Sequence, residues 1–137
     1  MAKPLRTAAS GTFFITAITA NRWRLFQVEH NARLFLETLQ HYRREGAYKL
    51  HAFVVMPDHV HLLLTTNDLS GAMKRVRGGF SYRLSSAHPI WQRGYADHAV
   101  TSRGDFDTRR NYIHQNPVRA RIVEHDHLYP YSSAFRG

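Results

Sequence analysis

The turn pair Pro57-Asp58 separates two apolar segments, YKLHAFVVM (48–56) and HVHLLLTT (59–66). Both segments are rich in aliphatic and β-branched residues, which favour strands. Proline cannot donate to a central strand ladder, and the pair Pro-Asp favours a turn. The two segments are therefore predicted to form a β-hairpin.

Strand and helix patterns alternate along the rest of the chain. GTFFITAITA (11–20) and YADHAVTS (95–102) have the composition of strands. In the segment 28–46, apolar residues recur at spacings of three and four, which predicts a helix. The residues of this stripe are Val28, Ala32, Phe35, Leu36, Leu39 and Tyr42.

Two further helices are predicted. One begins after the N-cap candidates Asn67 and Asp68 and is weakened by Gly78-Gly79. Its apolar stripe contains Leu69, Met73, Val76, Phe80 and Leu84. The other begins near Phe106, with Asp105 or Asp107 as its cap.

The predicted order is strand, helix, strand, strand, helix, strand, and then a further helix. Two split βαβ units in this order favour an α+β fold, a ferredoxin-like sandwich with an antiparallel sheet and helices on one face. The other face of the sheet is then expected to be open to a ligand. A chain of 137 residues with 43% hydrophobic residues is long enough for one domain, which we place at 1–137.

The charge of the chain favours an acidic partner. Lys and Arg number 19 against 10 Asp and Glu, a formal net charge of +9. Nucleic acid is the first candidate and an acidic membrane surface the second. No apolar segment reaches the roughly 20 residues of a membrane span, and MAKPLRTAASG lacks the apolar core of a signal peptide. We therefore expect a cytoplasmic protein.

His59 and His61 point to the same face of their predicted strand, because alternate side chains share a face, while Val60 points to the other. The chain has no cysteine, so a metal would have to be held by His, carboxylate, amide or water ligands. Two histidines fit an open Mg²⁺ or Mn²⁺ site completed by water or phosphate oxygens. The alternative is a pair of half-exposed sheet histidines bonded to their neighbours. The second pair, His125 and His127, lies in a polar segment and is not expected to bind metal.

Tyr112 and Asn116 lie one helical turn apart on one flank of the last predicted helix. Pro117 restricts Asn116 and is expected to kink or end the helix there. If this flank faces the histidines, Asn116 can supply a third metal ligand, and Tyr112 can attack a DNA phosphate to give a phosphotyrosine. The alternative is that Tyr112 only packs at the edge of the core.

These residues resemble the single-tyrosine HUH transposases, and in particular the REP-associated tyrosine transposases. The stretches that carry the resemblance are VVMPDHVHLLL (54–64), WQRGYADHAV (91–100), NYIHQNPVRARIV (111–123) and LYPYSSA (128–134). The family usually has Gly where this chain has Arg121. A left-handed backbone is therefore less expected at that position.

The resemblance implies that His59, His61 and Asn116 bind Mg²⁺ or Mn²⁺ and that Tyr112 is the nucleophile. It implies cleavage and rejoining of single-stranded DNA beside small hairpins, through a 5′-phosphotyrosine. The resemblance leaves undecided whether one chain completes the active site or two chains of a homodimer share it. Two rival hypotheses are a non-catalytic hairpin-binding protein of the same fold and an RNA-binding ferredoxin-like module, although the strands lack an RNP-type aromatic motif.

Binding of DNA is expected to use cations and stacked aromatic rings. The candidate aromatic residues are Trp91, Tyr95, Tyr129 and Tyr131. The candidate cations are Lys74, Arg75, Arg77, Arg83, Arg93, Arg109, Arg110, Arg119 and Arg121.

Overall fold

The computed structural model describes residues 9–137, so most of the basic N-terminal tail lies outside the described part. The sheet has the order β2-β3-β1-β4, and all neighbouring strands are antiparallel. This is the predicted βαββαβ arrangement, so the ferredoxin-like fold class is confirmed. In chain order the elements are β1 (Gly11–Ile18), α1 (Glu29–Arg44), β2 (Lys49–Met56), β3 (His59–Thr66), α2 (Leu69–Leu84), β4 (Ala96–Val100) and α3 (Arg103–Arg119).

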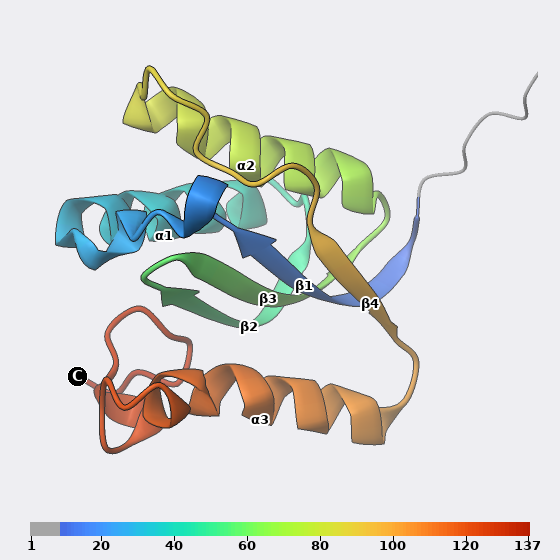
Figure 1. The fold of residues 1–137 in the computed structure, drawn as a ribbon. Coiled ribbons are helices and arrows are strands. Elements are labelled where there is room, and N and C mark those ends of the chain that lie inside the picture. Colours follow the sequence, from blue (N-terminus) through green and yellow to red (C-terminus); the bar gives the residue numbers. More distant parts are fainter. Residues whose placement is uncertain (1–8) are drawn as a thin grey trace, which may run out of the picture.

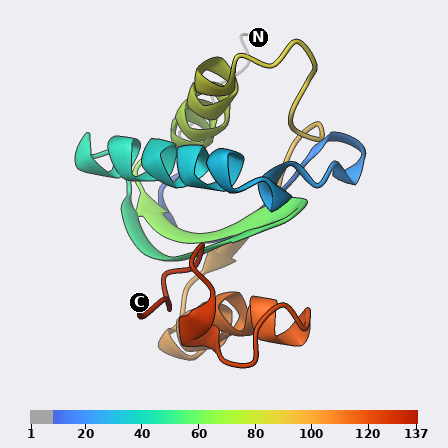
Figure 2. The same cartoon turned by 90° about the vertical axis from the view of Figure 1, so that its left-hand side faces the viewer.

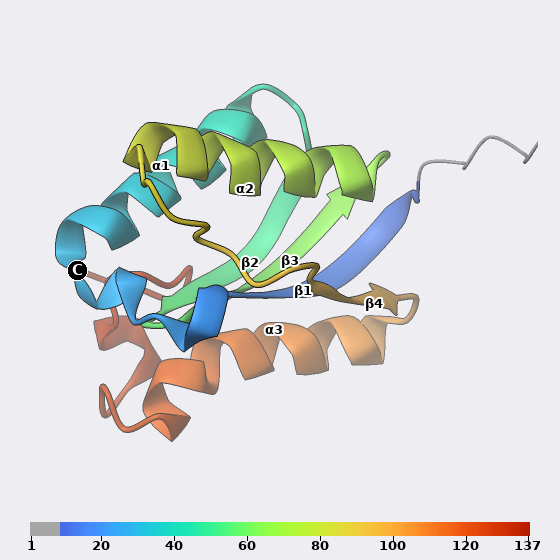
Figure 3. The same cartoon turned by 45° about the horizontal axis from the view of Figure 1, so that its top comes forward.

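Helices lie on both faces of the sheet. α1 and α2 lie on one face, and α3 crosses the other (Figures 1 and 2). Figure 3 shows that β4 leads directly into α3, which passes beneath the strands. The prediction of an open face is therefore wrong over the length of α3, because Ile113 of that helix is fully buried against the sheet.

Side chains of β3 alternate between two buried clusters, as its sequence predicts. Val60, Leu62 and Leu64 pack in the cluster beneath α1 and α2. Leu63 packs in the smaller cluster beneath α3. His61 shares the face of Leu63, because residues two apart on a strand point the same way.

The first two helices follow their predicted stripes with small differences. In α1 the residues Ala32, Phe35 and Leu39 are buried, but Val28 is 55% exposed because it precedes the first turn. α2 is capped by Asp68, whose Oδ1 accepts a hydrogen bond from the Gly71 amide at 3.0 Å.

The Gly78-Gly79 pair lies inside α2 and has a packing role. A Cβ atom at Gly79 would lie 2.6 Å from the Tyr42 hydroxyl of α1. The glycine therefore permits the close approach of the two helices, which offsets its low helix propensity.

The start of α3 differs from the prediction. The helix is capped by Ser102, whose Oγ accepts a hydrogen bond from the Asp105 amide at 3.1 Å, and begins at Arg103. Asp105 and Asp107 lie inside the first turns instead, where a negative charge favours the helix N-terminus.

The end of α3 also differs from the prediction. The helix continues through Pro117 and ends at Arg119. Arg121 is left-handed, with φ 59°, so the expectation against a left-handed backbone at this position is wrong. The Ile122 amide bonds to Pro117 O and the Arg121 amide to Val118 O, both at 3.0 Å. These two bonds form a Schellman motif, which requires a left-handed residue at this position whatever its side chain.

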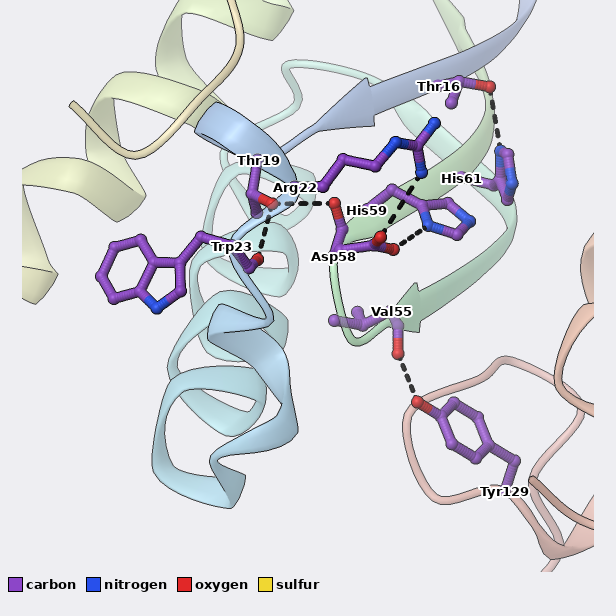
Figure 4. A network of polar contacts seen from close by, with 9 residues as sticks. All are labelled: Thr16, Thr19, Arg22, Trp23, Val55, Asp58, His59, His61 and Tyr129. Carbon is purple, nitrogen blue, oxygen red and sulfur yellow. Dashed lines mark hydrogen bonds and ion pairs between the residues drawn. The ribbon is translucent and has the colours of Figure 1, made fainter. Parts of the chain in front are cut away.

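The C-terminal segment packs along the outer edge of β2. The Val55 amide bonds to Tyr131 O at 2.8 Å, and the Ser133 amide bonds to Phe53 O at 3.0 Å. The Tyr129 hydroxyl donates to Val55 O at 2.6 Å (Figure 4). Tyr129 is therefore a buried structural residue, and the prediction that its ring stacks on DNA bases is wrong.

Within residues 9–137, none of the helices is both long enough and apolar enough to cross a membrane.

Candidate active site

His59 and His61 stand side by side on the sheet face that α3 covers. Their ring centroids are 4.8 Å apart. The Nδ1 atom of His59 lies 2.7 Å from Asp58 Oδ1, and the Nδ1 atom of His61 lies 2.9 Å from Thr16 Oγ1 (Figure 4). These two side-chain hydrogen bonds use Nδ1, so Nε2 is the nitrogen of each ring that can face another ligand. Metal-binding histidines are commonly oriented in this way, through a hydrogen bond at the second nitrogen.

Burial keeps His61 neutral. The side chain is 5% exposed, and Phe14 stacks on its ring at 5.3 Å between centroids. Burial, together with the charges of His59 and Arg119, lowers the pKa of His61 from 6.5 to about 3. At neutral pH the ring therefore keeps a lone pair that can bind a cation.

Asp58 is the carboxylate that orients His59. Burial alone would raise the pKa of Asp58, but hydrogen bonds and charges from His59 and Arg22 outweigh it and lower the pKa below its ordinary value. An ionised carboxylate can only accept hydrogen bonds, so the proton lies on His59 Nδ1. The Nε2 atom of His59 is then the free one.

Tyr112 of α3 lies against the histidine pair. Its ring packs edge-on to His61 at 5.5 Å and to Phe14 at 5.8 Å between centroids. The Tyr112 side chain is 40% exposed, so it also reaches solvent. The guanidinium of Arg119 lies 4.1 Å from the centre of the Tyr112 ring, a cation–π contact that helps to hold the ring in place. The predicted meeting of the helix flank with the histidine strand is thus present.

Asn116 lies one turn further along α3, at the level of His59. α3 runs antiparallel to β3. Near the start of α3, Phe106 contacts His51, which bonds to Thr65 at the end of β3. Further along α3, Tyr112 packs on His61 near the start of β3. Four helix residues advance about 6 Å, and two strand residues advance about 6.6 Å. The step from Tyr112 to Asn116 therefore parallels the step from His61 to His59.

The side chain of Asn116 has the chemistry of a third ligand. The residue is 9% exposed, and its amide oxygen is a ligand type that hard cations such as Mg²⁺ accept. In the described part of the chain, no three His, Cys, Asp or Glu side chains are grouped to hold a metal. A site at His59 and His61 would therefore need the Asn116 oxygen together with water or phosphate.

The cations of α3 lie at different distances from this site. Arg109 bonds to Asp105 at 3.1 Å and lies over the Phe14 ring at 5.1 Å. Arg110 pairs with Asp107 at 3.5 Å. Arg121 is exposed at the end of the helix.

The cations of α2 lie on the opposite face of the sheet from Tyr112. Arg77 donates to the carbonyls of Gln92 and Gly94 at 2.9 and 3.1 Å, so it ties α2 to the segment before β4. Arg83 lies over the Tyr42 ring at 5.5 Å. Lys74 and Arg75 are exposed on the same helix.

Arg93 differs from the α2 cations because it lies near the site. It lines a hollow together with Thr16, the residue that contacts His61, and Tyr95.

Sequence reasoning missed the residues that orient the histidines. Asp58 was assigned only to the turn, although its position next to His59 was a signal. Thr16 gave no signal, because its pairing with His61 depends on β1 lying beside β3. The pair His125 and His127 stacks at 5.6 Å between centroids, and it belongs to no group of three metal-binding side chains within residues 9–137.

Comparison with known proteins places the chain in a family. The family profile described as IS200-like transposase matches residues 9–116. The chain is 25% identical over 130 residues to the REP-associated tyrosine transposase of Escherichia coli K12. This match covers 92% of this chain and 78% of that protein. The chain is 27% identical over 146 residues to a Haemophilus influenzae protein whose name places it in the same group, with 92% and 81% covered.

A solved structure agrees with these matches in fold. The REP-associated tyrosine transposase bound to a REP hairpin superposes with a TM-score of 0.82 at 24% identity, covering 97% of this chain and 82% of that one. Since the family profile spans most of the chain, the protein belongs to the IS200-like transposase family, and its predicted relationship to REP-associated tyrosine transposases is confirmed.

Proposed function

We propose that this transposase cuts and rejoins single-stranded DNA beside small hairpins, with Tyr112 as the nucleophile. The observation that carries the proposal is the contact between Tyr112 of α3 and His61 of β3, at 5.5 Å between ring centroids. This contact brings the phenol of Tyr112 next to two histidines that are hydrogen-bonded through Nδ1 and can bind a ligand through Nε2. A hairpin substrate is supported by the similar protein whose solved structure is bound to a REP hairpin.

In the proposed step, Tyr112 Oη attacks the phosphorus of a DNA backbone phosphodiester. The bond from Oη to phosphorus forms as the bond from phosphorus to the 3′ oxygen breaks. The phenol proton passes to solvent, and the departing 3′ oxygen takes up a proton. The products are a free 3′-OH and a 5′-phosphate esterified to Tyr112. Attack by a 3′-OH on this ester reverses the step without an outside energy source, because one ester replaces another.

His59, His61 and Asn116 would hold the divalent cation, Mg²⁺ or Mn²⁺. Bound there, the ion would polarise the phosphate oxygens. Thr16 and Asp58 keep the two rings turned with Nε2 outward, at 2.9 and 2.7 Å from the Nδ1 atoms. Orientation by such partners commonly changes metal affinity 10- to 100-fold.

The cations near Tyr112 would bind the DNA backbone on the α3 face. Arg109, Arg119 and Arg93 lie closest to the site, by their contacts with Phe14, Tyr112 and the hollow at Thr16. The exposed cations of α2 and α3 would bind DNA further away; they are Lys74, Arg75, Arg83, Arg110 and Arg121. Loss of one phosphate contact should lower the slope of log affinity against log salt by about 1.

The test is a covalent adduct on a denaturing gel. The protein is incubated with a 5′-tailed hairpin oligonucleotide and Mn²⁺. We expect an adduct that disappears in Tyr112→Phe and on addition of a chelator. Tyr82→Phe is the matched control, since Tyr82 lies on α2 and is 85% exposed. An adduct that persists in Tyr112→Phe contradicts the nucleophile, and tight hairpin binding without any adduct supports the non-catalytic alternative.

A further inference from the structure

The turn Asn21–Trp23, between β1 and α1, has a strained backbone. Asn21 and Arg22 are both left-handed, with φ of 54° and 53°. Residues other than glycine rarely adopt this conformation, and two in succession are rarer still. Such strain persists only where the surrounding structure fixes it, and it is frequent at functional sites.

The surrounding structure fastens this turn to the turn that precedes β3. Thr19 is fully buried, and its amide donates to Asp58 O at 3.0 Å. Its hydroxyl lies 3.0 Å from Asp58 O and 2.6 Å from Trp23 O (Figure 4). The Phe26 amide donates to Pro57 O at 3.0 Å. The strained turn is thus held to the two residues that lead into His59.

The strained backbone brings the Arg22 side chain to Asp58. Arg22 Nη1 lies 3.4 Å from Asp58 Oδ2, while Asp58 Oδ1 accepts the Nδ1 proton of His59 at 2.7 Å. Each carboxylate oxygen therefore has one partner. Figure 4 shows the guanidinium, the carboxylate and the imidazole in this order. The Arg22 side chain is 63% exposed, and an ion pair so exposed adds little to stability.

We propose that Arg22 is a positioning residue that acts through Asp58 to fix the ring of His59. This role rests on the proposed function, in which His59 Nε2 binds a divalent cation. A carboxylate with partners on both oxygens keeps one orientation. Without Arg22, Asp58 is free to turn toward solvent, and His59 loses the acceptor that sets its tautomer and ring angle.

Binding of Mn²⁺ in the absence of DNA tests this role, measured by isothermal titration calorimetry. We expect Asp58→Asn to weaken Mn²⁺ binding about 10- to 100-fold. Arg22→Gln should weaken it several-fold. The double variant should bind no more weakly than Asp58→Asn alone, because the arginine acts through the carboxylate.

Two substitutions in the same turn serve as controls. Asn21→Gly removes a strained residue that has no bond to Asp58, and Arg24→Gln changes a cation whose partner is Gln27. Both should bind Mn²⁺ as the unmodified protein does. Arg22→Gly separates strain from positioning: it should leave the melting temperature unchanged or higher and still weaken Mn²⁺ binding, whereas a purely structural role would move the two together.

A second readout needs no metal. Long-range ¹H–¹⁵N NMR spectra of the histidine rings should show the Nδ1–H tautomer at His59 in the unmodified protein and a mixture of tautomers in Arg22→Gln. Arg22→Gln with an unchanged tautomer and unchanged Mn²⁺ affinity would overturn the proposal, as would additive effects in the double variant. If the unmodified protein binds no Mn²⁺ but the tautomer shifts, the positioning role stands and the metal in the proposed function fails.

Discussion

The two faces of the sheet bury different kinds of side chain. Beneath α1 and α2, four aromatic residues pack with centroids 5.3 to 6.0 Å apart, and they are Phe26, Phe35, Phe80 and Trp91. Beneath α3, the corresponding aromatic contacts join Phe14 to the ionisable rings of His61 and Tyr112. These four aromatic rings cannot titrate, whereas two of the three rings in contact beneath α3 can.

The buried polar groups differ in the same way. In α1, the Thr38 hydroxyl donates to Leu34 O at 2.8 Å, so it is satisfied within its own helix. On the α3 side, the buried His61 ring is bonded across two strands instead, from Nδ1 to Thr16 Oγ1 at 2.9 Å. The α1/α2 face thus holds the larger apolar core, and the α3 face holds the histidines and the tyrosine of the proposed site.

The largest expected effect is on the α1/α2 face. Phe80→Ala removes a fully buried ring and should lower the free energy of unfolding by about 3 to 5 kcal/mol, measured by urea denaturation. Adduct formation per folded molecule should not change, since Phe80 lies across the sheet from Tyr112. Ile113→Ala is the counterpart on α3, and it should reduce both stability and adduct formation. Loss of adduct in folded Phe80→Ala would break the division between the faces.

The next effect in size should be a loss of stability in acid, caused by His61 on the α3 face. The pKa of His61 is about 3 when folded and near 6.5 when unfolded, so the unfolded chain binds more protons between these values. The free energy of unfolding of the metal-free protein should therefore fall by a few kcal/mol, on the order of 1.4 per pKa unit, as pH drops from about 6.5 to 3. Above pH 6.5 His61 contributes no pH dependence. His61→Gln should flatten the profile, and an unchanged profile in that variant would contradict the assignment.

A smaller effect is expected at Thr16. Thr16→Val keeps the shape of the side chain but removes the partner of His61 Nδ1, which should cost about 1 kcal/mol of stability and about 10-fold in Mn²⁺ affinity. Thr12→Val is the matched control. Thr12 lies on the same strand and bonds to Thr65 at 2.7 Å, at the other end of β3 from His59 and His61. Equal losses of Mn²⁺ affinity in both variants would mean that each hydroxyl affects metal binding only by stabilising the sheet, and not by orienting His61.

The smallest effect should be a gain in stability. Arg121 and Ser85 end α3 and α2 with left-handed backbones, at φ 59° and 54°. Arg121→Gly and Ser85→Gly should each raise the free energy of unfolding by about 0.5 to 1 kcal/mol, measured by thermal or urea denaturation. Similar gains would show that strain at helix ends is common to both faces. A loss of stability in Arg121→Gly would show that its side chain makes a stabilising contact.

Much of the fold could be predicted because it rests on local patterns. The alternation of β3, the stripe of α1 and the Pro57-Asp58 turn each specify an element without reference to the rest of the chain. The contact of Tyr112 with His61 could be expected from the spacing of four between Tyr112 and Asn116 and from the strand period of two.

The remainder depends on partners that are distant in sequence. Arg77 has the pattern of a solvated helix cation, yet its acceptors are carbonyls some 15 residues later. The segment after Val123 has no period, because it is held by backbone bonds to β2. The left-handed Arg121 follows from helix-end hydrogen bonds that outweigh the preference of its side chain.

The docking of the C-terminal segment beside β2 has a consequence for assembly. A sheet can be extended by another chain only along a strand whose backbone groups are unpaired. Tyr131 and Ser133 already occupy the groups of Val55 and Phe53, so β2 offers a poor template for addition. The other edge strand of the sheet is β4, which leads into the first turn of α3. If another chain adds a strand to this sheet, we expect it to pair with β4.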